Sequence, residues 1–130
     1  MPSIFSKIVN GEIPAHKVAE TEEFLAFLDI NPLAKGHVLV IPKQEVDYLF
    51  DIEETTYANL MIFARVVAKA IKKAIPCKRI GVAVIGLEVA HAHVHLIPMD
   101  NVSDMDFSRP KLKLSEQELS EIALRILAAF

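Results

Sequence analysis

Cysteine, long apolar runs and an excess of basic residues are scarce or missing in this sequence. A single cysteine, Cys77, excludes an internal disulfide and suits a reducing compartment. No apolar run approaches the roughly 20 residues needed to cross a membrane, and the first residues lack the apolar segment of a signal peptide. The formal net charge is −3 with mixed signs, so we expect no basic surface for duplex nucleic acid. We expect a soluble cytoplasmic protein, with no nucleic-acid or membrane partner, that binds any phosphate-bearing ligand in a local pocket.

Repeats, low-complexity tracts and linkers are also missing. A chain of 130 residues is long enough for one domain with a sizeable core, so we expect a single domain over residues 1–130. Periodicity and turn signals predict helices over residues 3–10, 51–75 and 115–130, strands over residues 16–20, 24–30, 37–42, 79–85 and 91–97, and a polar loop over residues 101–113. This order predicts an α+β fold: a five-stranded, mostly antiparallel sheet with one long helix and short terminal helices, the helices covering one face.

The predicted long helix suggests an assembly. It is apolar over more of its circumference than a one-sided surface helix needs, with five residues clustered: Met61, Ile62, Phe63, Val66 and Val67. A monomeric soluble protein rarely exposes such a patch, so we expect a homodimer. In the last predicted helix, Ser115 and Glu118 stand in capping-box positions.

Three of the five histidines, His91, His93 and His95, alternate with apolar residues before Pro98. In a β-strand this spacing points all three from one face and the apolar alternates from the other. Adjacent histidines then lie about 7 Å apart, close enough for all three to reach one small ligand. We expect this histidine face to be the floor of an open site. His37, at the start of another strand, is by composition an ordinary surface or capping histidine.

Three chemistries fit the histidine face. Zinc binding is one, but His91 and His95 lie about 13 Å apart along a strand whereas a zinc–nitrogen bond is about 2 Å, and no cysteine or carboxylate nearby has ligand spacing. In the second, a neutral imidazole attacks a phosphoryl or nucleotidyl group while a neighbouring ring donates to the phosphate oxygens. In the third, the same donors bind a nucleotide without turnover. His93, with a partner on each side, is the natural nucleophile, and we expect no metal and no cofactor.

The sequence from His91 to Ile97 resembles the signature of the histidine triad (HIT) superfamily, in which three histidines alternate with apolar residues. Residues 3–8 and 11–14 resemble the family's N-terminal segment, and residues 27–32 and 36–43 resemble its central hairpin. The resemblance therefore extends over most of the chain and is closest to the Hint-like nucleotide-binding branch. It implies a five-stranded antiparallel sheet, a dimer through the long helix and a strand, and nucleotidyl hydrolase or transferase chemistry on purine nucleoside phosphoramidates or related nucleotide esters.

Carried over by position, the resemblance makes His93 the nucleophile and His95 the donor to the α-phosphate, while the main chain at His91 orients His93. His37 becomes a fourth histidine behind the triad. Asp29 accepts the ribose hydroxyls, whereas composition alone favours a turn role. The base pocket is walled by five residues that composition alone would place in the core: Phe5, Ile8, Ile13, Phe27 and Ile30.

In three places the sequence departs from the family pattern. Ser3 and Ser6 stand where many relatives carry two cysteines as half of a zinc site, which argues against structural zinc. The usual Asn of the fourth strand is missing from residues 81–84. The Gly-Gln-Ser/Thr before the triad is replaced by Gly86-Leu87-Glu88, and an ionised carboxylate cannot donate to phosphate. Glu88 either faces the ligand, if Gly86 bends the chain, or points to the opposite face.

The sequence therefore predicts a nucleotide phosphoramidase or nucleotidyl hydrolase that works through a covalent His93-nucleotidyl intermediate. A nucleotide-binding regulatory protein with little or no turnover is the first alternative, and a metal-binding protein is the second. The expected partners are a small purine nucleoside monophosphate derivative and a second copy of the chain.

Overall fold

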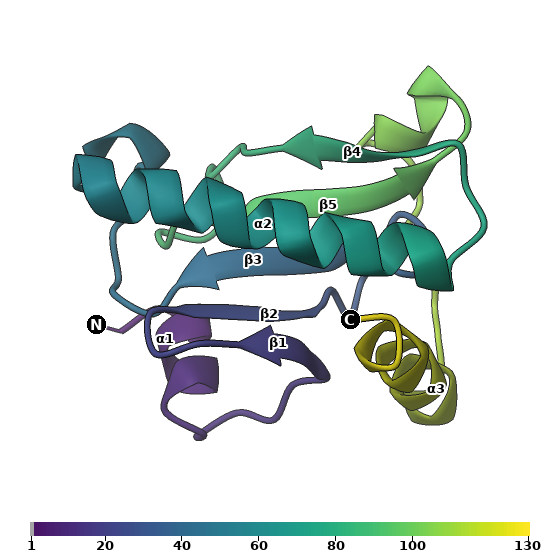
Figure 1. The fold of residues 1–130 in the computed structure, drawn as a ribbon, viewed down its shortest axis with the longest axis horizontal. Coiled ribbons are helices and arrows are strands. Elements are labelled where there is room, and N and C mark those ends of the chain that lie inside the picture. The colour runs from purple at the N-terminus through teal and green to yellow at the C-terminus, as the bar shows by residue number, and fades with distance from the viewer. Residues whose placement is uncertain (1) are drawn as a thin grey trace.

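Five antiparallel strands form one sheet around which the helices are arranged (Figure 1). The structure, a computed structural model, describes residues 2–130. The elements in chain order are α1 (Ile4–Val9), β1 (Lys17–Glu20), β2 (Phe24–Leu28), β3 (Val38–Pro42), the 3₁₀ helix η1 (Leu49–Asp51), α2 (Glu54–Ala74), β4 (Arg79–Ala83), β5 (Val94–Met99), the 3₁₀ helix η2 (Val102–Met105) and α3 (Glu116–Leu127). The strand order is β1-β2-β3-β5-β4, and neighbouring strands are antiparallel. The predicted α+β fold with a five-stranded antiparallel sheet is confirmed.

The helices lie on both faces of the sheet, not on one as predicted. α2 and α3 pack against one face, and α1 packs against the other, behind the sheet in Figure 1. The reason is that every residue of β2 and β3 is buried. Alternate residues of a strand point to opposite faces, so a strand that is apolar throughout needs cover on both. Ala26 and Val40 pack in the core under α2, whereas Phe27 and Leu39 pack with α1.

β5 begins three residues later than predicted and continues past Pro98. It spans Val94–Met99, so His91 and His93 precede the strand. A separate bond holds the segment before it, from the Ala92 N–H to the Val46 carbonyl (2.7 Å). Pro98 is tolerated because β3 pairs with β5 only as far as Leu96, and beyond that point β5 has one paired edge.

The outer surface of α2 is less apolar than predicted. Val67 is buried in the core, and Met61 and Phe63 pack partly against it. Of the five clustered residues only Ile62 and Val66 are exposed, at 60% and 49%. The edge strand β4 adds one exposed apolar side chain, Val82. The apolar patch is therefore smaller than the sequence suggested, and the homodimer stays a prediction.

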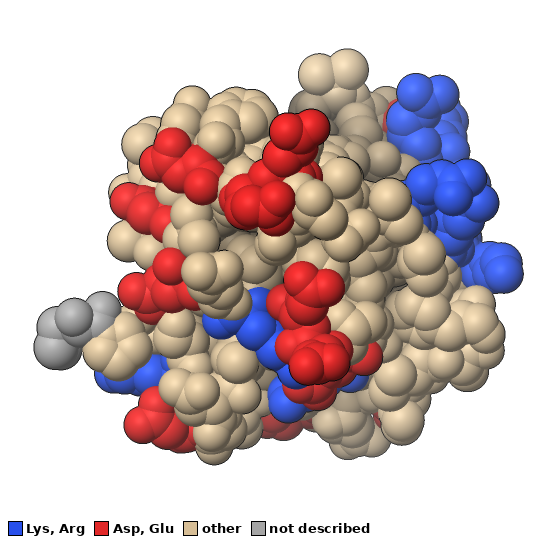
Figure 2. All heavy atoms as spheres, turned by 60° about the vertical axis from the view of Figure 1, so that its left-hand side comes forward, with Lys and Arg blue, Asp and Glu red and all other residues tan. Residues whose placement is uncertain are grey.

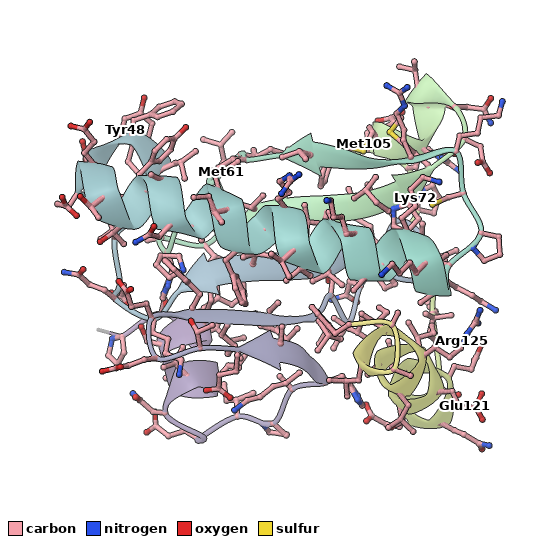
Figure 3. All side chains as sticks on the ribbon, in the orientation of Figure 1. Tyr48, Met61, Lys72, Met105, Glu121 and Arg125 are labelled. Atoms are coloured by element: carbon pink, nitrogen blue, oxygen red, sulfur yellow. The ribbon has the colours of Figure 1, made fainter. Side chains whose placement is uncertain are left out.

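Polar side chains begin and end the helices. Ser3 caps α1 by accepting a backbone N–H of that helix, and Ser115 and Glu118 form the predicted capping box of α3. The Arg125 guanidinium of α3 donates to the Ala74 carbonyl at the end of α2 (2.7 Å), which ties the two helices together (Figure 3).

The surface carries both signs of charge. In Figure 2 acidic side chains are spread over the face turned to the viewer, and basic side chains gather at the right edge and also lie between the acidic ones lower on the face. Four exposed basic residues share one side of α2: Arg65, Lys69, Lys72 and Lys73. None of the helices formed by residues 2–130 has the length and apolar character that crossing a membrane requires.

Candidate active site

A pocket of about 460 Å³ opens on the α1 side of the sheet. Its walls come from α1, β2, β3 and β5, from the loop between β4 and β5, and from the segment after η2. All the predicted site residues except His91 line it: His93, His95, His37, Asp29, Phe27, Ile30, Phe5, Ile8, Ile13 and Glu88. The fold therefore brings residues as far apart in the sequence as Ile4 and Lys111 to one concave site.

The apolar end of the pocket is built by α1 against β2. Phe5 packs edge-on against Phe27, with ring centroids 5.6 Å apart, and against the His93 ring at 4.9 Å. Phe5, Ile8 and Phe27 are buried, so they are core residues as well as pocket walls. Ile30 is different: it is 62% exposed and lies at the rim. An apolar wall with polar groups opposite it is typical of a site for a small organic ligand.

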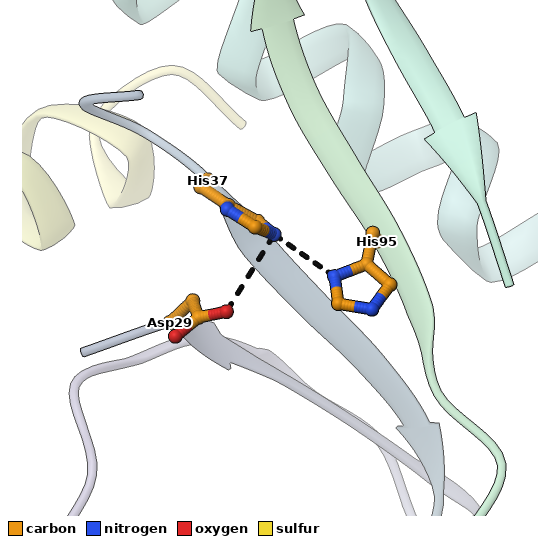
Figure 4. Close-up of side chains that lie close together, drawn as sticks. All are labelled: Asp29, His37 and His95. Atoms are coloured by element: carbon orange, nitrogen blue, oxygen red, sulfur yellow. Dashed lines mark hydrogen bonds and ion pairs between the residues drawn. The ribbon is translucent and has the colours of Figure 1, made fainter. Parts of the chain in front are cut away.

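His37 and His95 are joined by a hydrogen bond whose direction is fixed by its surroundings (Figure 4). The backbone N–H of Leu33 donates to His37 Nδ1 (3.0 Å), so a neutral His37 carries its proton on Nε2. That Nε2–H donates to His95 Nδ1 at 3.0 Å, with Asp29 Oδ2 at 3.6 Å. His95 then keeps its own proton on Nε2, on the side of its ring away from His37. His95 therefore offers the pocket an N–H donor.

Burial keeps both of these rings neutral. Burial, and then the neighbouring His95, lowers the pKa of His37 to about 3. Burial, and then His93, lowers the pKa of His95 to about 4. Both rings are therefore neutral at pH 7, and the hydrogen bonds from Leu33 to His37 and from His37 to His95 require neutral rings.

Asp29 has the turn role that composition favours and also lines the pocket. Its Oδ1 accepts the Asn31 N–H (2.8 Å) directly after β2. Burial raises the pKa of the Asp29 carboxyl above its ordinary value. A carboxylate has more acceptor sites than the contacts to Asn31 and His37 use, so it can also accept hydroxyl groups of a ligand.

His93 and His91 form a second pair. His93 Nδ1 lies 2.8 Å from the His91 carbonyl oxygen, which can only accept, so Nδ1 carries the proton and Nε2 of the neutral ring carries the lone pair. The His91 ring lies outside the pocket, where its Nε2–H donates to the Pro42 carbonyl (2.7 Å) and its Nδ1 accepts from Ser3 Oγ (2.8 Å). The prediction that all three rings reach one ligand is therefore wrong. Its premise fails because residues 91–93 precede β5 and do not alternate as a strand does.

Asp29, His37 and His95 place three ligand-type atoms within 4.8 Å of one another. These three residues do not have the sequence spacing of a metal-binding motif, and it is the fold that brings Asp29 beside the two histidines. A metal would need the lone pair of His37 Nε2, and the ring proton would then move to Nδ1 and face the Leu33 N–H. Two donors facing each other in a buried site are unfavourable. The cluster fits a chain of hydrogen bonds better than a set of metal ligands.

Two pocket residues come from the segment that the sequence suggested only as a polar loop. Phe107 packs edge-on against His95, with ring centroids 4.9 Å apart, and Lys111 adds a positive charge. The Leu112 N–H donates to the Pro32 carbonyl (2.8 Å), which attaches this segment to the loop after β2. Phe107 is the one aromatic residue of residues 101–113, and it was the sequence signal that this loop packs against the rest of the protein. No local sequence pattern predicts the contact with Pro32.

Glu88 lines the pocket, the first of the two orientations that the sequence left open. Gly86 has φ +74°, a left-handed conformation that glycine adopts without strain. Residues 84–93 lie outside β4 and β5, so strand alternation does not turn Glu88 to the opposite face. Glu88 therefore reaches the pocket from a loop that turns at Gly86.

Comparisons with known proteins find one family throughout. The HIT domain family matches residues 10–102. The chain is 34% identical over 128 residues to adenosine 5'-monophosphoramidase of Schizosaccharomyces pombe, covering 97% of this chain and 96% of the relative. It is 36% identical over 127 residues to adenosine 5'-monophosphoramidase of Saccharomyces cerevisiae, covering 96% and 80%. The crystal structure of a Hit-like protein from Bartonella henselae superposes with a TM-score of 0.86 at 33% identity, over 98% of this chain and 96% of that one.

Proposed function

The chain belongs to the HIT domain family, and we propose that it is a cytoplasmic nucleotide hydrolase that cleaves purine nucleoside phosphoramidates or related nucleotide esters through a covalent His93-nucleotidyl intermediate. One observation carries the proposal. A histidine lone pair, on His93 Nε2, and a histidine N–H, on His95 Nε2, belong to rings whose centroids lie 4.9 Å apart in one pocket. The names of the two yeast relatives support this substrate class.

In the proposed reaction the lone pair of His93 Nε2 attacks the α-phosphorus and the bond from phosphorus to the leaving group breaks. The leaving amine or alcohol takes the bonding pair and a proton from solvent. The ring becomes positively charged, and the His91 carbonyl, which accepts from Nδ1–H, stabilises that charge. The Nε2–H of His95 donates to a phosphate oxygen, where negative charge increases in the transition state. Water then attacks phosphorus and gives a proton to solvent. The bond from phosphorus to His93 Nε2 breaks, which returns the lone pair to the ring and releases the nucleoside monophosphate.

Three other groups bind the nucleotide in this proposal. Asp29 accepts the ribose hydroxyls, as its free acceptor sites allow. The apolar wall of Phe5, Ile8, Ile13, Phe27 and Ile30 holds the base. Lys111 supplies a positive charge at a site whose usual hydroxyl donor is replaced by Glu88.

Glu88 also favours a second candidate, a nucleotide-binding regulatory protein with little or no turnover. A carboxylate at the pocket repels a phosphate group and cannot donate to it. The two candidates are separated by measuring nucleotide binding by titration and turnover by product release.

We also propose a homodimer that covers Ile62, Val66 and Val82. Light scattering at micromolar concentration is expected to give twice the chain mass of 14.5 kDa. Val82→Arg should give the monomer mass, because it places a charge in the covered patch. Leu124→Arg, at an exposed apolar position of α3, is the matched control and should leave the mass unchanged. A wild type with the monomer mass would contradict the dimer.

Rapid-quench mass spectrometry tests the covalent step. After millisecond mixing with AMP phosphoramidate and an alkaline quench, the peptide containing His93 is expected to carry a nucleotidyl adduct. The adduct should be missing in His93→Ala and present in His16→Ala, since His16 lies outside the pocket and bonds Glu116 at 3.0 Å. Turnover without an adduct, or an adduct on another residue, would contradict the proposal.

A further inference from the structure

The His91 carbonyl orients the proposed nucleophile, yet no strand ladder holds it. β5 begins only at Val94. The His91 side chain is fully buried and is held at both ring nitrogens, by the Pro42 carbonyl and by the Ser3 hydroxyl. The direction of the carbonyl is therefore set at two points: by the Ala92 N–H, which shares its peptide plane and donates to the Val46 carbonyl (2.7 Å), and by what holds the His91 ring.

A second set of hydrogen bonds joins Ser3 to the loop after β3. Glu45 Oε1 accepts from the Ser3 backbone N–H (2.6 Å) and from the Ser6 hydroxyl (2.6 Å). The next residue of the same loop, Val46, accepts the Ala92 N–H (2.7 Å). The start of α1, residues 45–46 and residues 91–92 are thus bonded to one another.

The protons of this cluster have one consistent arrangement. The Pro42 carbonyl can only accept, so His91 carries its proton on Nε2 and its lone pair on Nδ1. The Ser3 hydroxyl therefore donates to Nδ1, while its oxygen accepts the Ser6 N–H (3.0 Å). The hydrogen bond from the Ser6 hydroxyl, and then that from the Ser3 N–H, lowers the pKa of Glu45 to about 2. The Glu45 carboxylate, the last acceptor in this series of hydrogen bonds, is therefore ionised at pH 7.

We propose that Ser3 and Glu45 are positioning residues for the nucleophile. Glu45 holds Ser3, the Ser3 hydroxyl holds the His91 ring as its Nε2–H tautomer, and the His91 carbonyl then keeps the proton of His93 on Nδ1. The lone pair of His93 Nε2 is thereby kept available to the pocket. The proposal rests on the proposed role of His93 and extends it to two residues that do not line the pocket.

The expected effect falls on kcat more than on KM. α1 stays attached to the sheet through Phe5 and Ile8, which are buried in an apolar cluster with Phe27. Removing the Ser3 hydroxyl therefore leaves the wall of the base pocket in place. What changes is the fraction of molecules in which His93 has its lone pair on Nε2.

The first experiment measures the tautomers directly, by nitrogen-15 NMR of histidine-labelled protein at pH 7. In the wild type we expect His91 as the Nε2–H form and His93 as the Nδ1–H form. Ser3→Ala removes the nearer hydroxyl at His91 Nδ1 and leaves Ser6 Oγ at 3.5 Å, already donating to Glu45, so the His91 resonances should shift and His93 should become a mixture of tautomers. Ser3→Thr, which retains a hydroxyl, should give the wild-type pattern. Glu45→Ala, which does not touch His91, should give a smaller change of the same kind.

The second experiment measures kcat and KM with AMP phosphoramidate. Ser3→Ala is expected to lower kcat about tenfold and Glu45→Ala about threefold, with KM changed by less than about twofold. Ser115→Ala is the control for loss of a serine cap, since Ser115 caps α3 far from His91 in the chain and outside the pocket. Glu53→Ala is the control for loss of a capping carboxylate, since Glu53 accepts two N–H groups and a hydroxyl at the start of α2. Both controls should retain wild-type kcat.

Three results would overturn the positioning role. One is a wild type with the His93 proton on Nε2. Another is a Ser3→Ala protein with unchanged resonances and kcat. The third is a loss of kcat in Ser3→Ala while His93 keeps its wild-type tautomer, because the residue would then act by another route. A folded wild type with no turnover would count against the proposed function, and the NMR measurement would still decide the positioning role.

Discussion

His95 and Leu96 are neighbours in β5, and they point to opposite faces of the sheet. Leu96, 1% exposed, lies in an apolar core built with α2 and α3. His95, 8% exposed, is buried almost as deeply. The buried polar side chains found among residues 2–130 are four histidines, and all lie on the α1 side with His95: His37, His91, His93 and His95.

The two faces are stabilised differently. The apolar face gains free energy in proportion to buried area, about 25 cal/mol per Å², with no directional requirement. On the histidine face, within the part of the chain that the structure describes, every side-chain nitrogen that is closed off from the surface has a hydrogen-bond partner, and Nε2 of His93 and of His95 are left for the pocket. Removing one partner leaves a buried polar group unsatisfied. The apolar face therefore determines mainly stability, and the histidine face determines where the protons are.

The largest expected effect is that of His93→Ala on turnover. Because it removes the nitrogen that we propose attacks phosphorus, kcat should fall by about 1,000-fold or more. His93 borders the pocket, but it also packs on Phe5 and donates to the His91 carbonyl, so the free energy of unfolding should fall by about 1–2 kcal/mol, less than for a core leucine. Steady-state kinetics and urea unfolding measure the two quantities.

Leu96→Ala is the counterpart on the other face. It should lower the free energy of unfolding by about 2–5 kcal/mol, because it leaves a cavity in the core. The kcat of the folded fraction should stay within about threefold of the wild type, since the change is on the opposite side of the sheet. If His93→Ala were as destabilising as Leu96→Ala, or if it kept its kcat, the distinction between the faces would be wrong.

The pH dependence of stability should come from the histidine face. Burial first, and then a neighbouring histidine, lowers the folded-state pKa of His95 to about 4 and that of His37 to about 3, from an ordinary value of 6.5. The unfolded chain therefore binds more protons below pH 6.5, so the stability that depends on the neutral rings is complete above that pH and is lost as the pH falls toward 4 and then 3. Urea unfolding between pH 7 and pH 4 should show this loss.

The same urea unfolding measurements between pH 7 and pH 4 distinguish a substitution on the histidine face from one on the apolar face. His95→Gln should reduce the dependence on pH, because the side chain no longer titrates. Leu96→Ala should lower the free energy of unfolding equally at every pH and leave the slope unchanged. An equal slope in wild type and His95→Gln would mean that other groups control the acid sensitivity.

The apolar face was largely predictable from the sequence, and the histidine face only in part. Periodicity found α2, the strands and the capping box at Ser115, because these depend on neighbours in the chain. The turn role of Asp29 follows from composition, since Asn31 is two residues away. The placement of α1 was missed although the fully apolar β2 already required cover on both faces.

What the sequence could not give depends on contacts between distant residues. Glu45 meets Ser3 across 42 positions, and His37 meets His95 across 58. Phe107 and Lys111 reach the pocket because Leu112 bonds Pro32, a pairing with no local signature. His91 was assigned to the wrong environment because the start of β5 is set by its pairing with β3 at Val40, and not by the alternation of the histidines.

A moderate effect is expected from Glu88→Ser, which replaces a carboxylate at the pocket by a hydroxyl donor. It should raise kcat/KM for AMP phosphoramidate about tenfold, or about 1.4 kcal/mol of transition-state stabilisation. The acidic limb of the profile between pH 5.5 and 8.5 should shift to lower pH, because a nearby carboxylate favours the protonated imidazole. Glu121→Ser, on the outer side of α3 in Figure 3, is the matched control. An unchanged profile would mean that Glu88 does not act on the bound phosphate.

The smallest expected effect is that of chelation, which should change kcat by less than about twofold. Asp29, His37 and His95 are near enough to share an ion, but the Leu33 N–H occupies His37 Nδ1 and so keeps the proton on the nitrogen that a metal would need. An ion there would also take the lone pair of His95 Nδ1 and so replace the hydrogen bond from His37 that holds the His95 ring in place. Added zinc should therefore inhibit rather than activate, and elemental analysis of the active protein should find no stoichiometric metal. Activity that is lost on chelation and restored by zinc would show that a metal, and not a chain of hydrogen bonds, organises the histidine face.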